Sequence, residues 1–315
     1  MEKKNFLLSI VVPVFNEEEC IDEFKNKVFD VMKANNINFE IIFVDDGSSD
    51  NSLEILKEFQ AKDDRIKVLS FSRNFGHQIA LTAGMDYVSG DCVITMDGDL
   101  QHPPELIPQM LELWQKGNDI VYTVRQQTED AGTFKKITSK LFYKIINYIS
   151  EIDLNYSAAD FRLMDKKVLT YFKQLNERSR MIRGLISWLG FKSIGLDYTA
   201  PKRFAGKTKY SFKKMFIFAL DGMTSFSIFP LRIASLLGIV VSIFSFLYVL
   251  YIIYARLFTD STIQGWTSIL FSLLFLGGIQ LITIGIIGEY IGRIYIEVKN
   301  RPIYVLKDKL GFEGK

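Results

Sequence analysis

The chain has few cysteines, little net charge and no glycine-rich dinucleotide fingerprint, and each shortage argues against a class of function. Its two cysteines, Cys20 and Cys92, lie far apart without metal-like spacing, so we assign them to ordinary packing in a reducing compartment. A formal net charge of +2 over 315 residues argues against a nucleic-acid-binding surface. No Gly-x-Gly-x-x-Gly turn follows the first apolar strand, which argues against a dinucleotide-dependent reductase.

Charged residues are also absent from two C-terminal segments, residues 233–255 and 266–288. Each can cross the roughly 30 Å hydrocarbon layer as a helix, and uncharged runs of this length exceed ordinary globular helices. The outer flanks of the two segments are rich in lysine and arginine, which predicts both flanks on the cytoplasmic side and residues 256–265 as an outer loop. The apolar stretch at residues 6–12 is too short for a secretory signal. We therefore expect a multi-pass protein of the cell membrane with both termini cytoplasmic.

Two further segments, residues 133–150 and 211–226, combine apolar faces with lysines. This pattern is typical of helices that lie on a bilayer surface, where each lysine attracts anionic lipid by about 1 kcal/mol. For residues 133–150, a helix packed on the sheet with a lysine-rich solvent face explains the pattern equally well. For residues 211–226, the adjacent span favours the membrane surface.

An apolar run at residues 93–96 ends abruptly in two carboxylates, Asp97 and Asp99, on either side of Gly98. The run is typical of a buried parallel strand, and open α/β sheets bind ligands beyond the carboxyl ends of such strands. Two hard oxygen ligands around a glycine suit Mg²⁺ or Mn²⁺ shared with phosphates. An isolated Asp-x-Asp is equally typical of a solvated turn, so its interpretation depends on the neighbouring strand ends.

Two upstream strands end in the same way, one in Asp45 and Asp46 and the other in a turn that contains Glu17. The predicted order is a strand at 7–14, a helix at 21–35, a strand at 40–44, a helix at 52–61, a strand at 66–71 and a helix at 78–88. This alternation predicts a doubly wound, mostly parallel α/β sheet whose ligand crevice gathers the polar turns at one edge.

The chain has two histidines, and both lie near these turns. His77 stands at a helix start without a partner at ligand spacing, which is more typical of a capping or core-edge residue than of a catalytic one. His102 follows the acidic pair and is the better candidate for supporting the site.

Five segments together resemble family 2 glycosyltransferases, and more narrowly the polyprenyl-phosphate glycosyltransferases. They are residues 11–17 (VVPVFNE), 44–50 (VDDGSSD), 97–105 (DGDLQHPPE), 157–164 (SAADFRLM) and 203–211 (RFAGKTKYS). The branch includes dolichyl-phosphate mannose synthase and the bactoprenol glucosyltransferases, which share two C-terminal spans. The resemblance covers nearly the whole chain. Gly98 stands where Ala is more usual and Thr208 where Ser is common, and both substitutes are small.

The resemblance implies a GT-A-like domain and a role for each motif residue. The residues implied to bind the nucleotide sugar are Pro13, Phe15, Glu17, Val44, Asp46, Asp97, Arg125 and Lys209. The implied metal ligands, for Mg²⁺ or Mn²⁺, are Asp99, Gln101 and Asp97. The implied contacts to the acceptor phosphate are Arg162, Arg203 and Lys209. The residues expected to carry catalysis are Asp97, Asp99, Asp160 and Arg203.

Elementary chemistry agrees with this assignment. Breaking a sugar–diphosphate bond leaves negative charge on the leaving group, which a divalent cation and fixed Arg or Lys groups stabilise. A lipid monophosphate is mostly dianionic at neutral pH, so its transfer requires no strong general base. We therefore expect Asp160 to organise Arg162, the metal site or the acceptor phosphate. The alternative is an ion pair that locks the turn at residues 160–162.

The basic loop at residues 202–214 has two interpretations, a solvated charge run beside the membrane or a phosphate clamp. Its position directly before the first span favours the clamp, because a lipid phosphate would emerge there. Gly206, between Arg203 and Lys209, suits a loop that closes over the donor and the lipid phosphate together.

We predict an inverting, metal-dependent transferase that moves one hexose from UDP-glucose or a UDP-N-acetylhexosamine to undecaprenyl phosphate, for modification of cell-wall or other surface glycans. One alternative is a GDP-mannose-dependent polyprenyl-phosphate mannosyltransferase. A processive polysaccharide synthase is disfavoured, since such enzymes have more spans and a Gln-x-x-Arg-Trp signature. A phosphatase-type hydrolase would leave Asp45 and Asp46 unexplained, and a membrane scaffold would not need the acidic pair.

The predicted organisation has four segments. They are a cytoplasmic GT-A-like domain at residues 1–210, an amphipathic juxtamembrane helix at 211–228, a two-helix transmembrane hairpin at 229–292 and a cytoplasmic tail at 293–315. Because two spans bury little helix–helix surface, we also expect a homo-oligomer.

Overall fold

The computed structural model describes residues 6–125, 158–178, 180–198, 227–258 and 265–312. These residues form two compact units. The described residues up to 198 and the segment 301–312 belong to the first unit, and residues 227–300 to the second. Both predicted amphipathic stretches, 133–150 and 211–226, lie outside the described residues.

An eight-stranded mixed sheet forms the first unit, in the order β7-β5-β6-β4-β1-β2-β3-β8. The strands are β1 (Leu8–Val14), β2 (Phe39–Asp45), β3 (Ile66–Phe71), β4 (Cys92–Thr95), β5 (Ile120–Arg125), β6 (Ala158–Asp165), β7 (Ser193–Tyr198) and β8 (Leu306–Leu310). The first four strands are parallel, and β5 is parallel to β7, whereas β6 runs antiparallel to β4 and β5. The strand order reverses beside β1, which is where doubly wound sheets bind ligands. The predicted mostly parallel α/β sheet is confirmed.

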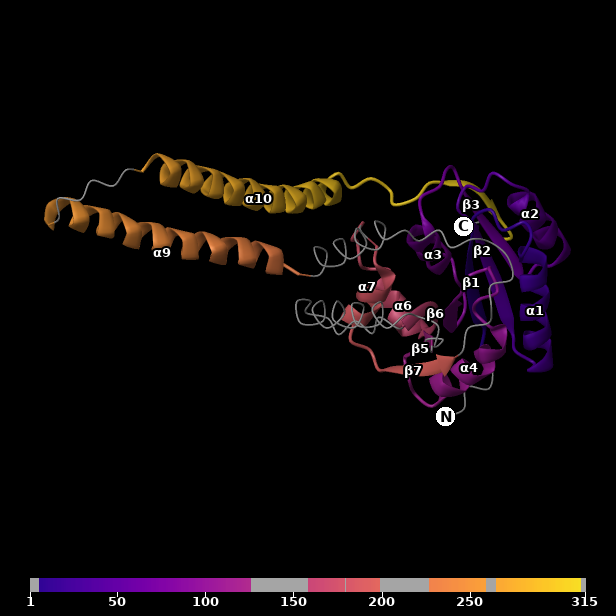
Figure 1. The fold of residues 1–315 in the computed structure, drawn as a ribbon. Coiled ribbons are helices and arrows are strands. Elements are labelled where there is room, and N and C mark those ends of the chain that lie inside the picture. Colours follow the sequence, from indigo (N-terminus) through magenta and orange to yellow (C-terminus); the bar gives the residue numbers. More distant parts are fainter. Residues whose placement is uncertain (1–5, 126–157, 179, 199–226, 259–264, 313–315) are drawn as a thin grey trace. The chain divides into compact units, whose positions relative to one another are not determined.

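Helices cover both faces of this sheet, with α1 and α3 on opposite sides (Figure 1). The helices are α1 (Ile21–Ala34), α2 (Ser52–Lys62), α3 (His77–Asp86), α4 (Ile107–Gln115), α6 (Lys166–Phe172) and α7 (Ile182–Trp188), with a 3₁₀ turn η1 (Pro104–Leu106) before α4. One apolar cluster joins the sheet to α1, α2 and α4, and another joins it to α3.

The central strands are buried on both faces. Every residue of β1 and β2 is buried, as a near-continuous apolar run requires between two layers of helices. Phe43 packs toward α1 and α2, whereas its neighbour Val44 packs toward α3, because successive side chains of a strand point to opposite faces. A Cβ on Gly84 of α3 would lie 2.2 Å from Cγ1 of Val11, so glycine allows this helix to lie close against β1.

The C-terminal segment returns to the sheet as its edge strand, although no strand is predicted there from the sequence. β8 pairs antiparallel with β3, and the ring of Tyr304 stacks on Phe71 with centroids 5.4 Å apart. The Tyr304 hydroxyl donates to Oδ2 of Asp86 at 2.9 Å. Residues 301–312 are therefore a structural part of the sheet domain.

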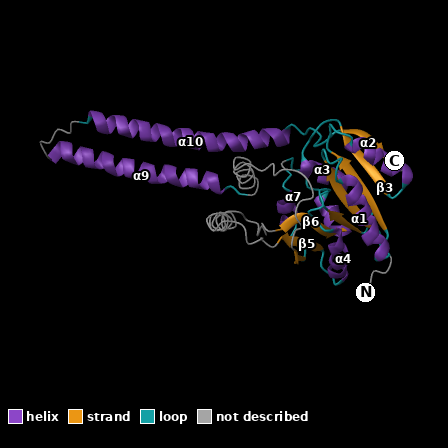
Figure 2. Cartoon of the chain, turned by 45° about the vertical axis from the view of Figure 1, so that its right-hand side comes forward, coloured by secondary structure: helices purple, strands orange, loops and turns teal. Residues whose placement is uncertain are grey.

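The second unit contains two long helices, α9 (Phe229–Phe258) and α10 (Trp266–Val298), which lie side by side (Figures 1 and 2). Tyr290 Oη donates to the carbonyl oxygen of Ser227 at 2.6 Å. Both helices are long and apolar enough to cross a membrane, and almost none of either candidate span is buried within the protein. A core helix of a soluble protein would bury its apolar face. The two helices cover both predicted spans.

Candidate active site

The turns after β1 and β2 lie side by side at one edge of the sheet. Pro13 and Val44 are paired across the two strands, and Phe15 is partly exposed just beyond β1. The Glu17 N–H donates to Ser52 Oγ, at the start of α2, at 3.0 Å. The structure therefore brings together the two strand ends that were predicted to hold the base and ribose of a nucleotide.

Asp46 is a buried carboxylate that holds the loop between β3 and α3. Its Oδ1 accepts from the Phe75 N–H at 2.6 Å and its Oδ2 from the Gly76 N–H at 3.0 Å. Burial raises the pKa of Asp46, and the two N–H donors oppose that rise only in part. At Gly47, φ is +72° and a Cβ would lie 2.7 Å from the Arg73 backbone, so this close approach requires glycine. The predicted ribose contact of Asp46 stays a prediction, and its observed partner is the loop that leads to His77.

Asp97 lies just beyond β4, and both histidines of the chain contact it. Nε2 of His77 lies 2.7 Å from Oδ1 of Asp97. Nδ1 of His102 accepts from the Asp97 backbone N–H at 3.0 Å, and the His102 ring stacks on Phe161 of β6. Burial raises the pKa of Asp97, but the hydrogen bond with His77 and the electrostatic attraction of the two histidine rings together outweigh it and leave this pKa below its ordinary value. Asp97 is thus held as an oriented, ionised carboxylate.

Asp99 and Gln101 face each other across a tight turn. The Gln101 backbone N–H donates to Oδ1 of Asp99 at 3.1 Å, and its side-chain Nε2 donates to Oδ2 at 2.6 Å. Leu100 between them is buried and has a φ of +62°. This turn places a carboxylate and an amide, both hard oxygen donors, next to Asp97.

Asp99 and Gln101 fit a divalent cation that is shared with a substrate. Over the part of the chain that the structure describes, no three His, Cys, Asp or Glu side chains form a metal cage. Mg²⁺ typically takes one or two protein carboxylates and completes its shell with phosphate oxygens and water. Asp99, with the amide oxygen of Gln101, matches that donor set.

Asp160 on β6 reaches the same edge of the sheet. The antiparallel register pairs Thr95 with Arg162, and Thr95 Oγ1 donates to the Asp160 carbonyl oxygen at 2.6 Å. Arg183, at the start of α7, donates from Nε to Oδ1 of Asp160 at 2.8 Å and from Nη2 to Oδ2 at 3.0 Å. Nη2 of Arg162 lies farther away, 3.8 Å from Oδ1. The main partner of Asp160 is therefore Arg183.

The charges around Asp160 restrict what it can do. Burial raises its pKa, but the charge and hydrogen bonds of Arg183, with the charge of Arg162, hold the pKa well below its ordinary range. Burial lowers the pKa of Arg162 to about 10, which leaves this guanidinium charged at neutral pH. A carboxylate with so low a pKa is a poor proton acceptor. The geometry therefore favours an organising role for Asp160 over that of a general base.

Three predicted phosphate contacts have no described side chain. Arg125 is the last residue of β5, while Arg203 and Lys209 lie outside the described residues. Their roles stay predictions.

Two residues gain importance from the structure. No pattern in the sequence predicts a role for Arg183, and the sequence predicts mainly a capping role for His77. Arg183 follows no motif and lies 23 positions from Asp160, so nothing local in the sequence marks it. His77 carried a weak signal, since it directly follows a polar turn at the end of a predicted strand.

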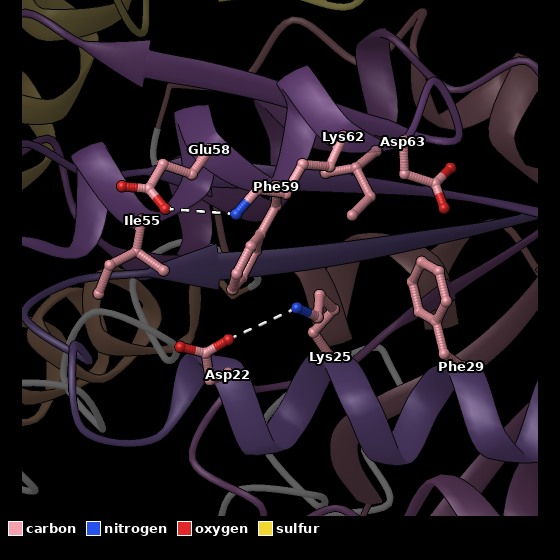
Figure 3. Close-up of a pocket in the computed structure, with 9 residues that line it drawn as sticks. Asp22, Lys25, Phe29, Ile55, Glu58, Phe59, Lys62 and Asp63 are labelled. Atoms are coloured by element: carbon pink, nitrogen blue, oxygen red, sulfur yellow. Dashed lines mark hydrogen bonds and ion pairs between the residues drawn. The ribbon is translucent and has the colours of Figure 1, made fainter.

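A hollow of about 380 Å³ lies between α1 and α2 (Figure 3), and none of the predicted site residues lines it. Among its charged side chains, Lys25 pairs with Asp22 within α1, Lys62 pairs with Glu58 within α2, and Asp63 pairs with Arg65 just beyond α2. We interpret it as a groove between two surface helices and assign no site to it.

Comparison with known proteins identifies the family. Glycosyl transferase family 2 matches residues 9–172. The uncharacterized glycosyltransferase YkcC of Bacillus subtilis is 48% identical over 307 residues, 98% of this chain and 95% of that protein. The SfII prophage-derived bactoprenol glucosyl transferase of Shigella flexneri is 44% identical over 300 residues, 95% of this chain and 97% of that protein.

Among solved structures, mannosyl-3-phosphoglycerate synthase from Rubrobacter xylanophilus aligns with a TM-score of 0.49 and 14% identity, over 69% of this chain and 71% of that chain. The sequence matches carry the assignment, since the family match spans more than half of the chain and contains Asp46, Asp97, Asp99 and Asp160. The chain therefore belongs to glycosyl transferase family 2 and is a glycosyltransferase.

Proposed function

We propose that this enzyme transfers a single hexose from a nucleotide sugar, UDP-glucose or a UDP-N-acetylhexosamine, to polyprenyl phosphate. The observation that carries the proposal is the combination, in one chain, of the carboxylates beyond β4 and two exposed apolar helices. The first suits a nucleotide diphosphate with its cation, and the second suits a lipid acceptor. The near full-length similarity to a protein named bactoprenol glucosyl transferase supports the same acceptor.

Different turns of the sheet domain bind different parts of the donor. The turns after β1 and β2 receive the base and ribose, where Phe15 offers an exposed ring and Glu17 a carboxylate. Asp97, oriented by His77, faces the ribose and the diphosphate. Asp99 and Gln101 hold Mg²⁺ or Mn²⁺, which would neutralise the charge that develops on the leaving diphosphate.

The acceptor needs positioning more than activation. A phosphate monoester is mostly dianionic at neutral pH and can attack the sugar carbon directly, with inversion and without a covalent enzyme intermediate. The low pKa of Asp160 agrees with this, because a carboxylate so strongly paired does not serve as the base. We assign Arg125, Arg162, Arg203 and Lys209 to the phosphates of donor and acceptor.

The C-terminal strand supports the membrane topology. β8 belongs to the same sheet as the N-terminal strands, so the chain that leaves the sheet after β7 returns to it after α10. A chain that leaves one side of a bilayer and returns to it must cross an even number of times, and α9 and α10 supply two crossings. The basic flanks place that side in the cytoplasm. We also propose that the protein forms a homo-oligomer through the exposed helices.

A single assay tests the function. The purified full-length protein is incubated with undecaprenyl phosphate, Mg²⁺ or Mn²⁺, and one of four radiolabelled donors, UDP-glucose, UDP-N-acetylglucosamine, UDP-galactose or GDP-mannose, and the lipid is then extracted. We expect label in the lipid from a UDP-sugar. Asp99→Asn should abolish transfer, whereas Asp64→Asn, at an exposed aspartate before β3, should not. Transfer from GDP-mannose alone would replace the donor assignment, and no labelled lipid from any donor would refute the proposal.

A further inference from the structure

Gln78, the second residue of α3, lies between the His77–Asp97 contact and the start of α7. Its Oε1 accepts from the Ile182 N–H at 3.1 Å, across 104 positions of sequence. Its Nε2 lies 3.4 Å from Nδ1 of His77. One side-chain amide therefore bridges the histidine that contacts Asp97 and the helix that carries Arg183.

The backbone of α7 fixes which way this amide points. A backbone N–H can only donate, so the group of Gln78 that faces Ile182 must be its oxygen. The NH₂ group then faces His77, and an NH₂ group can only donate. This orientation therefore follows from the fixed backbone donor.

The orientation of the amide selects the form of His77. If Nδ1 accepts from Gln78, the ring proton lies on Nε2, and Nε2–H donates to Oδ1 of Asp97 at 2.7 Å. The other tautomer would present a lone pair to the carboxylate and an N–H to the NH₂ group of Gln78, and both contacts would be repulsive. Of the two neutral tautomers, Gln78 thus favours the one that donates to Asp97.

The surrounding contacts hold Gln78 itself. Thr82 Oγ1 donates to the Gln78 carbonyl oxygen at 2.8 Å, and the Gly76 N–H, two residues before, is held by Asp46. Both neighbours of the His77 ring, Gln78 on one side and Asp97 on the other, are therefore placed by packed elements of the sheet domain.

We propose that Gln78 is a positioning residue of the glycosyltransferase, and that it acts through His77 to orient Asp97. The proposal rests on the function proposed above, since the orientation of Asp97 affects turnover only if Asp97 contacts the donor. No contact of Gln78 with substrate is required.

A double-mutant cycle tests the route through His77. Gln78→Leu removes both hydrogen bonds at similar size and should lower kcat about tenfold, less than the roughly hundredfold cost of a 1 Å misplacement, because Asp97 keeps its contact with His77. In a His77→Asn background the same change should lower kcat less than about twofold, because the intermediary is gone. Gln109→Leu, at an exposed glutamine on α4, is the matched control and should leave kcat unchanged. Equal losses from Gln78→Leu in both backgrounds would overturn the proposal.

A second measurement does not depend on activity. The chain has two histidines, so ¹⁵N-histidine labelling gives two imidazole ring systems, which His77→Asn assigns. We expect the Nε2–H tautomer for His77 in the parent protein, and a shift of its Nδ1 resonance in Gln78→Leu while the His102 resonances stay in place. Gln78→Met, which also lacks a donor, repeats the test if the leucine variant does not fold. An unchanged His77 Nδ1 resonance would refute the role of Gln78. An inactive parent protein would refute the proposed function, but the resonance would still test whether Gln78 acts on His77.

Discussion

Arg183, at the start of α7, donates two parallel hydrogen bonds to Asp160 of β6, at 2.8 and 3.0 Å. The planar guanidinium matches both carboxylate oxygens at once, which a lysine cannot do. The carboxylate is mostly buried, with its side chain 13% exposed, while that of Arg183 is 34% exposed. The pair therefore fixes the position of Asp160 and keeps it charged.

Removing Arg183 should impair both turnover and stability. Arg183→Ala leaves a mostly buried carboxylate without its main partner, and we expect kcat to fall by about tenfold or more. The free energy of unfolding should fall by roughly 1–3 kcal/mol, less than for a fully buried pair because Arg183 is partly solvated. Arg183→Lys should give an intermediate loss. Steady-state kinetics and thermal unfolding of the full-length protein check both effects.

The chain offers a matched control for this variant. Arg65 and Asp63 form a pair of the same bidentate geometry, at 3.0 and 2.7 Å, but on the exposed surface before β3. Exposed pairs contribute about 0–1 kcal/mol, so Arg65→Ala should change neither kcat nor the unfolding temperature by much. If Arg183→Ala behaved like Arg65→Ala, the pair would have no part in the site.

Metal removal should abolish transfer and reveal the ligand role of Asp99. EDTA should stop labelling of the lipid, and Mn²⁺ in excess should restore it. In Asp99→Asn the Mn²⁺ affinity in the presence of UDP, followed by the electron paramagnetic resonance signal of unbound Mn²⁺, should fall by about tenfold or more. Full activity in EDTA would contradict the metal site.

The core of the fold could be predicted because its signals are local. Apolar runs such as residues 7–14 are buried on both faces in the structure, and the polar residues that end them mark the carboxyl ends of parallel strands. The predicted helix starts at Ile21 and Ser52 agree with the structure. No strand pattern marks β8, because its three central residues, Lys307, Asp308 and Lys309, are charged, as an exposed edge strand allows, and its partner β3 is distant in sequence.

The site could be predicted only in part, for a related reason. The Asp-x-Asp turn and the Asp45–Asp46 turn can be recognised in the sequence, because acidic residues directly follow an apolar run. The contacts that orient them join residues of different elements, His77 to Asp97 over 20 positions and Arg183 to Asp160 over 23. Such contacts depend on the register between β4 and β6 and on how α3 and α7 pack, and these are tertiary properties.

The C-terminal strand should stabilise the sheet domain through Tyr304. Tyr304→Phe keeps the stack on Phe71 but removes the hydrogen bond to Asp86, which should lower the free energy of unfolding by about 1–2 kcal/mol. Tyr304→Ala should lower it by about 3 kcal/mol or more. Tyr171→Phe, at a tyrosine that is 52% exposed on α6, should have almost no effect. Equal unfolding temperatures for Tyr304→Ala and the parent protein would mean that β8 does not contribute.

Glu40 should make the sheet domain sensitive to acid. Burial raises the pKa of this carboxyl, but hydrogen bonds from Lys67, Ser9 and the Ser89 N–H outweigh it and lower the pKa below its ordinary value of 4.5. A lowered folded-state pKa stabilises the protein above about pH 4.5, and that stabilisation is lost as the pH falls through the folded-state pKa. Glu40→Gln should therefore lower the unfolding temperature at pH 7. It should also reduce the fall of the unfolding temperature between about pH 5 and about pH 3, the window in which linkage places the loss of this stabilisation. Glu58→Gln, at an exposed glutamate of α2, is the control, and an unaltered pH dependence in Glu40→Gln would contradict this assignment.

The return of the chain to the sheet makes the membrane topology testable in cells. Cys20 and Cys92 are buried, so the parent protein should react little with a membrane-impermeant maleimide. Lys33 on α1 and Lys307 on β8 are exposed residues of the same sheet domain. Lys33→Cys and Lys307→Cys should therefore both react only after the membrane is permeabilised. Ser261→Cys, between the two apolar helices, should react in intact cells. Reaction of Lys307→Cys but not of Lys33→Cys in intact cells would mean an odd number of crossings, and β8 could then not belong to the sheet of β1.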